Sequence, residues 1–173
     1  MPLSLYDATV PAFLQILPSI SGLLDKGAAW CRERGVADTA LTEARLAPDM
    51  WPFASQVRSC WAHSADAVDA VKSGEARPDF SEPPRDFAGL KARVEDAIAR
   101  LKAVTPDELE AVESGDTYFQ IGERRMDFRS VDYLLTFALP NFYFHATTAY
   151  AILRNQGLEI GKRDFLGGIK LKG

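Results

Sequence analysis

The chain has 173 residues, of which 47% are hydrophobic and 25% are charged, and it carries a net charge of −4. These proportions exclude a disordered chain, and the length suits one compact domain, which we expect over residues 1–173. Binding nucleic acid requires clustered Lys and Arg, and since the sequence shows no such clustering we expect no nucleic-acid partner.

The cysteines and the first residues favour a cytoplasmic protein. Cys31 and Cys60 lie far apart, without CxxC or zinc-ligand spacing, so we expect two buried thiols in a reducing compartment. The chain does not open on a basic segment followed by an apolar run. No stretch approaches eighteen uninterrupted apolar residues either, so we expect no membrane partner.

The first predicted element is a long helix from residue 4 to about residue 34, because its apolar positions are spaced alternately by three and four. Gly35 is placed to end this helix, and Pro18 should bend it because proline removes a backbone hydrogen bond. A second apolar row recurs every seven residues and could face either a neighbouring helix or a second copy of the protein: Ile16, Leu23 and Trp30.

A polar link then leads to a second predicted helix, which begins near Pro52 and ends at Gly74. Asp49 is placed to cap it, and Pro52 suits its first turn. The proline-rich run at 75–85 cannot stay helical, so it predicts a surface connection of polyproline or turn character.

A third helix is predicted from about residue 86 to residue 104. Thr105 to Glu108 form a capping box, with proline at the first helical position, and should start a short helix. Between 117 and 128 the pattern changes to two short apolar runs around Gly122, which predict a β-hairpin.

The last predicted helix starts near Ser130, which can cap it, and continues to about Gln156. Pro140 lies in its interior and implies a kink or a freed carbonyl next to Asn141. Four long amphipathic helices pack most simply as a bundle. The sequence therefore predicts an all-α fold, a four-helix bundle with a short β-hairpin inserted before the last helix.

A candidate site follows from the histidines of the chain, His63 and His145, which fall on or beside the inward faces of two predicted helices. Gln56 lies two turns before His63, and Asn141 lies one turn before His145. Imidazole is a common ligand for zinc, nickel and iron, and bundles assemble such ligands from facing helices. One interpretation is a divalent-metal site with His63 and His145 as ligands, in a pocket also lined by Gln56 and Asn141.

A plainer interpretation is that each histidine is partly buried and hydrogen-bonded to a hydroxyl, a carbonyl or a carboxylate such as Asp66. An open catalytic zinc site needs three protein ligands, whereas the sequence offers two strong ones. Cys60 could be a nucleophile only if an adjacent base lowered its pKa, so an inert buried thiol is the simpler interpretation.

Several short stretches are spread over nearly the whole chain: LSLY (3–6), VPAFL (10–14), RLAPDM (45–50), LPNFYFH (139–145), TAYAILR (148–154) and GKRDFLG (161–167). Together they resemble an uncharacterised branch of the DinB/YfiT-like metalloenzyme superfamily, a branch of domains of unknown function. This resemblance implies a helical bundle of up-down-down-up type that is often dimeric.

The resemblance also bears on the site. Metal-binding members of the superfamily use one histidine on the second helix and a His-x3-His pair on the last. His145 is similar to the second histidine of that pair, the first falls on Asn141, and His63 lies near the second-helix position. An amide oxygen is a poor substitute for imidazole on such metals, so the resemblance implies a weakened, altered or lost metal site.

We therefore expect a protein of unestablished activity whose inter-helix polar pocket binds either a divalent metal or no cofactor. A bound metal would activate a water or a thiol, and the resemblance suggests a metal-dependent hydrolase or thiol transferase. The alternative is a non-catalytic homodimeric or ligand-binding bundle that has lost the metal site. Its interface would be formed by Ile16, Leu23 and Trp30.

Overall fold

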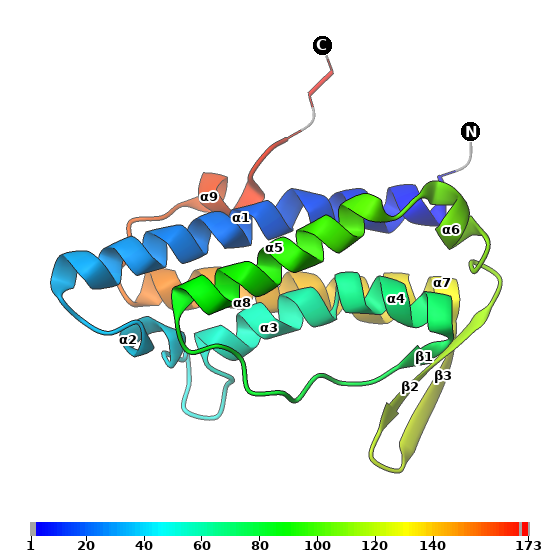
Figure 1. The fold of residues 1–173 in the computed structure, drawn as a ribbon, viewed down its shortest axis with the longest axis horizontal. Helices are drawn as coiled ribbons and strands as arrows, with labels where there is room; N and C mark the ends of the chain where they lie inside the picture. The colour runs from blue at the N-terminus through cyan, green and yellow to red at the C-terminus, as the bar shows by residue number, and fades with distance from the viewer. Residues whose placement is uncertain (1–2, 170, 173) are drawn as a thin grey trace.

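Long helices make up most of the protein, and a small sheet lies at one end, in a computed structural model that describes residues 3–169 and 171–172 (Figure 1). The long helical segments are α1 (Leu5–Arg34), α3 (Phe53–Ala62), α4 (Ala65–Ser73), α5 (Phe87–Ala103), and α7 (Ser130–Asp132) leading through the π-helix η1 (Tyr133–Ala138) into α8 (Leu139–Asn155). The shorter elements are α2 (Thr39–Thr42), α6 (Pro106–Glu110), α9 (Lys162–Leu166), β1 (Glu75–Ala76), β2 (Asp116–Ile121) and β3 (Arg124–Arg129).

Helix α1 confirms the predicted first helix. The Ser4 hydroxyl accepts from the Asp7 N–H at its start, and Gly35 ends it with φ of 63°. Ile16 and Leu23 are buried inside the chain, so these two residues face neighbouring elements and cannot form an interface with a second copy. By length and composition α1 could span a membrane. However, 56% of its most apolar window is buried within the protein, as in a core helix.

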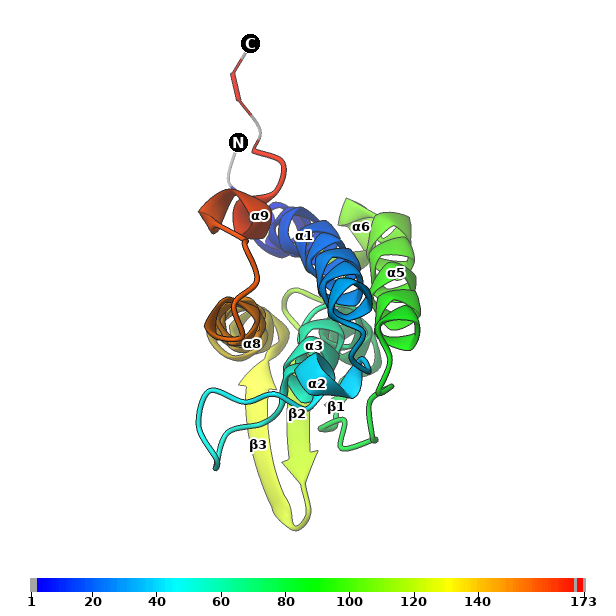
Figure 2. The same ribbon diagram turned by 90° about the vertical axis from the view of Figure 1, so that its left-hand side faces the viewer.

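The long helices pack around a shared apolar core. Figure 2 shows α1 beside α5, with α3 and α8 below them. Phe13 of α1 meets Phe142 of α8 edge to face, with ring centroids 4.9 Å apart. Both rings are fully buried, and burial of a side chain of this size contributes roughly 1.5–3 kcal/mol. The core thereby joins the first long helix, α1, to the last long helix, α8.

The predicted second helix is wrong as one continuous element, because it is broken between α3 and α4 at His63 and Ser64. The backbone of Ser64 leaves the helical region, and its hydroxyl donates to the Cys60 carbonyl oxygen at 2.6 Å. A serine hydroxyl that bonds a carbonyl four residues earlier competes with the helix and often bends it. Asp49 does not cap α3, since the residue preceding the helix is the extended Pro52.

The β-hairpin is confirmed as β2 and β3, joined at Gly122 with φ of 57°. The prediction of a strand-free connection at 75–85 is wrong at its start, because β1 pairs in parallel with β2, and the sheet order is β1-β2-β3. The edge of β2 offers free backbone groups, and the Tyr118 N–H donates to the Gly74 carbonyl oxygen at 3.1 Å. The fold is thus mostly helical with a small sheet.

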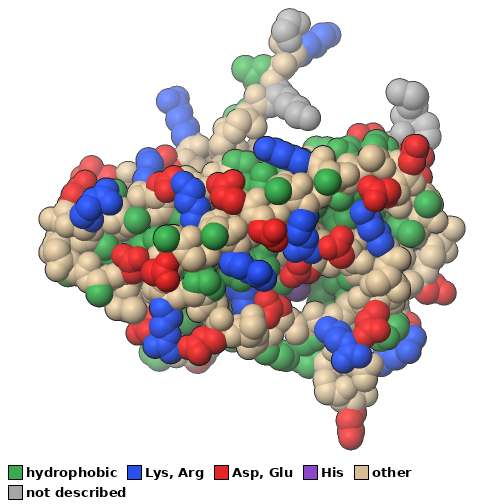
Figure 3. All heavy atoms as spheres, viewed as in Figure 1, with side chains coloured by type: hydrophobic (Ala, Val, Ile, Leu, Met, Phe, Trp, Pro, Cys, Tyr) green, Lys and Arg blue, Asp and Glu red, His purple; other side chains and the backbone are tan. Residues whose placement is uncertain are grey.

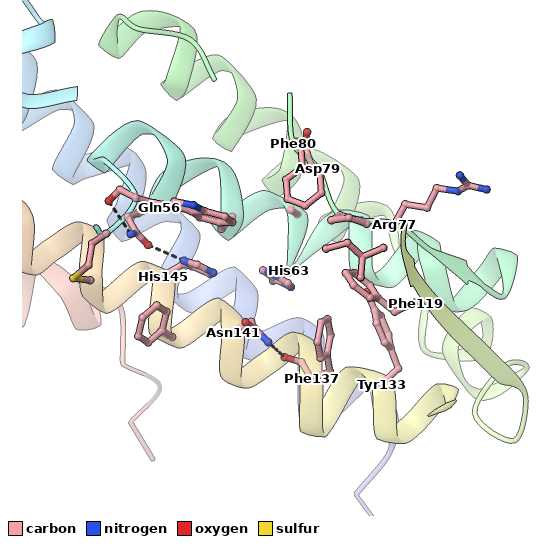
Figure 4. Close-up of a pocket in the computed structure, with 17 residues that line it drawn as sticks. Gln56, His63, Arg77, Asp79, Phe80, Phe119, Tyr133, Phe137, Asn141 and His145 are labelled. Atoms are coloured by element: carbon pink, nitrogen blue, oxygen red, sulfur yellow. Dashed lines mark hydrogen bonds between the residues drawn. The ribbon is translucent and has the colours of Figure 1, made fainter. Parts of the chain in front are cut away.

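The last helical segment reaches from Ser130 to Asn155 as predicted, but it widens into the π-helix η1 just before Pro140. Ser130 does not cap the segment, because its hydroxyl lies 2.9 Å from the Thr117 hydroxyl. Single π turns inside α-helices are frequent at functional sites. This one brings Tyr133 and Phe137 toward the space between α8 and the sheet (Figure 4).

The segment after α8 folds back along α1. The Gln15 amide donates to the Leu166 carbonyl oxygen at 3.1 Å. Gly167 has φ of 60°, and a Cβ added to it would lie 2.3 Å from the Ser19 hydroxyl oxygen. A residue without a side chain is therefore needed where the tail crosses α1.

Charged side chains of both signs are interspersed on the face of the molecule seen in Figure 3. Lys91 of α5 pairs with Asp25 of α1 at 2.6 Å, and Arg100 pairs with Asp66 at 2.8 Å. Such exposed pairs each contribute up to about 1 kcal/mol. Their main consequence is that charges on neighbouring helices neutralise one another.

Candidate functional site

A pocket of about 430 Å³ opens between α3, α8, η1, the segment after β1, and the hairpin (Figure 4). This volume lies within the range of small-molecule sites. Six aromatic side chains from different parts of the chain line it: Trp51, Phe80, Phe119, Tyr133, Phe137 and Phe144.

The four residues that the sequence singles out, Gln56, His63, Asn141 and His145, all line this pocket. Gln56 lies on α3, His63 immediately follows that helix, and the other two lie one turn apart on α8. The structure therefore brings the two halves of the candidate site together.

The His145 ring is held in one orientation by a buried amide. Its Nδ1 lies 2.7 Å from Oε1 of Gln56, while Nε2 of Gln56 donates to the Trp51 carbonyl oxygen at 3.0 Å. Because the amide NH2 faces a carbonyl, the amide oxygen must face the ring. This network assigns the proton to Nδ1 of His145 and leaves its Nε2 as a hydrogen-bond acceptor.

His63 lies beside His145 with its ring nearly parallel, at 5.5 Å between centroids and 6° between planes. Its Nδ1 is buried and has no hydrogen-bond partner among the residues that the structure describes. The carboxylate suggested as its partner, Asp66, instead accepts from Arg100 at 2.8 Å. Since Nδ1 is enclosed, Nε2 is the nitrogen of His63 available to a ligand.

Both histidines are neutral at pH 7. Burial lowers the pKa of His63 to about 4. Burial comes first, followed by the repulsion that the His63 ring would exert if protonated and by the charge of Arg58, in lowering the pKa of His145 to about 4. Desolvation disfavours the charged imidazolium, so both rings stay unprotonated well below neutral pH.

Asn141 also presents an acceptor. Its Nδ2 donates to the Phe137 carbonyl oxygen at 2.7 Å, in the turn where η1 joins α8 (Figure 4). Because one N–H of the amide donates to the backbone, the orientation of the amide is set, and its side-chain oxygen can accept from a ligand.

The pocket mouth carries an ionised carboxylate. Burial raises the pKa of Asp79, but its hydrogen bonds to Ser81 and the charge of Arg58 outweigh this effect and hold the pKa below its usual range. Arg77, also at the mouth, pairs with Glu75. The segment after β1 thus supplies one carboxylate and one engaged guanidinium.

Sequence reasoning missed the residues that hold this mouth together. Trp51, which lies outside every predicted helix, is 44% exposed and lines the rim of the pocket. Arg58 of α3 is buried, lies over the Trp51 ring at 5.2 Å and donates to the Ser81 carbonyl oxygen at 2.6 Å. Its isolated position in the sequence gives no signal for this role.

The donors present do not fit a catalytic metal centre. Within the described residues, no three His, Cys, Asp or Glu side chains gather closely enough to hold a metal ion. A metal-bound histidine almost always donates its other N–H to a supporting acceptor. His145 has such an acceptor in Gln56, whereas Nδ1 of His63 has none among the described residues.

Cys60 offers no alternative nucleophile. Its side chain is fully buried, and burial raises the pKa of its thiol above the ordinary value. The Sγ atom lies 3.4 Å from the Gln56 carbonyl oxygen, to which it can donate. A thiol in this environment is inert, as the sequence predicts.

Comparison with known proteins gives a family and a solved structure of similar fold. The profile of the family described as Domain of unknown function (DUF1993) matches residues 5–166. The crystal structure of a DinB family member protein from Shewanella denitrificans is similar, with a TM-score of 0.82 and 26% sequence identity, over 98% of this chain and 95% of that chain. No protein with a curated description matches the chain.

Proposed function

The chain belongs to the DUF1993 family, an uncharacterised branch with a DinB-like fold, and from this premise we propose that it is a ligand-binding protein whose pocket takes a small planar molecule without a catalytic metal. The aromatic wall and the converging polar groups support the proposal, because small-molecule sites combine apolar surface with a few fixed polar atoms.

We also propose the finer architecture. In it, α1, α3 with α4, α5, and η1 with α8 are the four members of a DinB-like bundle that forms one domain over residues 1–173. The packing of α1 on α5 and of α3 on α8 supports this arrangement. The homodimer expected from the resemblance would need another surface, because Ile16 and Leu23 are buried.

The observation that carries the proposed function is the amide at position 141. Catalytic zinc sites use three protein ligands, and the pocket supplies two imidazoles with an amide oxygen between them in sequence. Amide oxygens suit hydrogen bonds better than they suit zinc, nickel or iron. The same groups that make a poor metal site make a well-ordered set of hydrogen-bonding atoms.

One observation favours a second candidate, a metal-dependent hydrolase or thiol transferase of the kind suggested by the DinB resemblance. Gln56 orients His145 as a supporting residue orients a metal ligand, and both histidines are neutral as ligands must be. In this candidate His63 and His145 would hold zinc, nickel or iron.

Metal analysis of untagged protein separates the two candidates. The variants His63→Ala and His145→Ala are purified beside the wild type, with thermal unfolding as the check on folding. We expect less than one equivalent of metal in all three proteins. A site that is occupied in the wild type and emptied by either substitution would overturn the proposed function in favour of the metalloenzyme.

A blocked pocket tests ligand binding directly. Ala62 lines the pocket, so Ala62→Trp should fill it, while Ala29→Trp places the same bulk in a different groove beside Trp30. A fragment set is screened by ligand-observed NMR. We expect a group of planar fragments that bind the wild type and Ala29→Trp but not Ala62→Trp. Fragments that bind all three proteins alike, with none specific for the open pocket, would contradict the proposal.

A further inference from the structure

The inner part of the pocket presents fixed hydrogen-bond acceptors. Both amide NH2 groups donate one hydrogen bond to a backbone carbonyl, Gln56 to Trp51 at 3.0 Å and Asn141 to Phe137 at 2.7 Å, and these bonds set the orientation of each amide. The first bond fixes Nε2 of His145 as an acceptor, and the second leaves the oxygen of Asn141 as another. His63 can adapt, because a neutral imidazole exposes either a lone pair or an N–H at Nε2.

The two fixed acceptors lie on the same side of α8. Residues four apart on a helix have Cβ atoms about 5–6 Å from each other, so Asn141 and His145 can be reached by one edge of a single flat molecule. Such a molecule must carry N–H or O–H groups on that edge, because an acceptor left without a donor in a closed site is unfavourable.

The charges around the pocket disfavour an anion. Asp79 at the mouth is held ionised by its hydrogen bonds to Ser81 and by Arg58. Arg77 pairs with Glu75, and Arg58, which does not line the pocket, donates from one Nη to the Ser81 carbonyl oxygen and carries a charge opposite to that of Asp79. A carboxylate or phosphate would meet acceptors inside and a negative charge at the entrance.

The walls fit a flat apolar body. Trp51 lies nearly parallel to His145, at 11° and 5.8 Å between centroids, and Phe144 meets the same ring edge-on at 5.2 Å. At the mouth Trp51, Phe80 and Phe144 are 44%, 62% and 56% exposed. Apolar side chains gathered at one opening mark a binding surface, because covering them removes apolar area from water.

We infer that the natural ligand is a planar aromatic or heteroaromatic compound, neutral or cationic, that carries N–H or O–H donors on one edge. The donor edge points to Asn141 and His145, and the flat body lies against the aromatic mouth. This inference rests on the proposed function and names the ligand class of the same pocket.

Matched probe pairs test the donor requirement. Indole and 1-methylindole differ by one N–H, and benzamidine and benzoate differ in the charge and donors of their head group. Dissociation constants are measured by ligand-observed NMR titration of the full chain. We expect indole to bind about tenfold more tightly than 1-methylindole, the effect of one hydrogen bond in a closed site, and benzamidine to bind more tightly than benzoate.

Variants at position 141 locate the effect. Asn141→Leu keeps the size of the side chain but removes the acceptor, so indole should lose its advantage while 1-methylindole binds as before. Asn141→Gln keeps both the amide donor and an acceptor and should retain the preference, which covers the case in which Asn141→Leu fails to fold. Asn155→Leu, at the end of α8 and outside the pocket, is the control.

The outcomes separate this inference from the proposed function. Equal binding of indole and 1-methylindole, or tighter binding of benzoate than of benzamidine, would overturn the ligand class and leave a ligand pocket in place. Absence of binding by all four probes would also overturn the ligand class. The proposed function is decided separately, by the fragment screen on the open and blocked pockets.

Discussion

Two carboxamides determine what the pocket offers a ligand. Gln56 and Asn141 each donate a hydrogen bond from the side-chain NH2 group to a backbone carbonyl. The oxygen of Gln56 is thereby directed at His145, and the oxygen of Asn141 is left for a ligand. His145 acquires its tautomer from Gln56. The chemistry of the site therefore depends on residues that would not touch the ligand as well as on those that would.

Substitutions of Gln56 test this coupling. Gln56→Leu removes the acceptor of His145 and leaves a buried N–H without a partner, which should lower the free energy of unfolding by about 1–3 kcal/mol in urea titrations. Gln56→Glu places a carboxylate beside the same ring and should raise the pKa of His145, followed by NMR of its ring protons. An unchanged pKa in Gln56→Glu would show that Gln56 does not control His145.

Many of the individual residues of the site could be predicted from the sequence, because they follow helical spacing. Gln56 and His63 are seven apart, and Asn141 and His145 are four apart, so each pair shares a helix face. The aromatic mouth could not be predicted, because Trp51 and Phe80 lie in connecting segments that no periodicity describes. The partner of His145 was also missed, since hydrogen bonds between helices depend on tertiary packing.

Among the elements, those with a local signal were predicted well. Helices α1 and α5 and the hairpin follow from apolar spacing and from their capping or turn residues. The break between α3 and α4, the π-helix η1 and strand β1 depend on competition for backbone groups. Ser64 takes a carbonyl that α3 would leave unpaired, and β1 forms where β2 offers a free edge.

Docking of α9 on α1 should depend on the close packing of Gly167 against α1. Gly167→Ala would place a Cβ 2.3 Å from the Ser19 hydroxyl oxygen, at a φ of 60° that favours glycine. We expect it to destabilise the protein by about 1–3 kcal/mol and to speed amide hydrogen exchange in α9.

Gly168→Ala is the matched control, because a Cβ there meets nothing within 4 Å. Its unfolding free energy should stay close to that of the wild type. If both substitutions had the same effect, close packing of Gly167 on α1 would not be the cause.

For the whole molecule, the buried neutral histidines predict a loss of stability in mild acid. Each has a pKa of about 4 when folded, against an ordinary value of 6.5, so the unfolded chain binds more protons between these pH values. The free energy of unfolding is therefore fully retained above about pH 6.5 and falls as the pH drops toward 4. The loss is on the order of 3 kcal/mol for each histidine.

Urea titrations at pH 7 and pH 4.5 check this dependence. A variant that carries both His63→Phe and His145→Phe should lose less stability over the same interval, and the difference isolates the histidines from carboxylates that titrate nearby. Equal losses in the two proteins would assign the acid sensitivity to other groups.

The fold brings His63 and His145 together in a pocket where the DinB resemblance suggests a metal site. Asn141 lies where that resemblance suggests a third histidine. The central claim is that this pocket serves a hydrogen-bonding ligand and no longer a catalytic metal. Asn141→His restores the third imidazole on the face of α8 that already lines the pocket.

Calorimetric titration of zinc into the wild type and Asn141→His, side by side, tests the claim most directly. We predict weak binding by the wild type and an affinity at least about tenfold higher in Asn141→His. Stoichiometric, tight binding by the wild type, with no gain from the added histidine, would contradict the account.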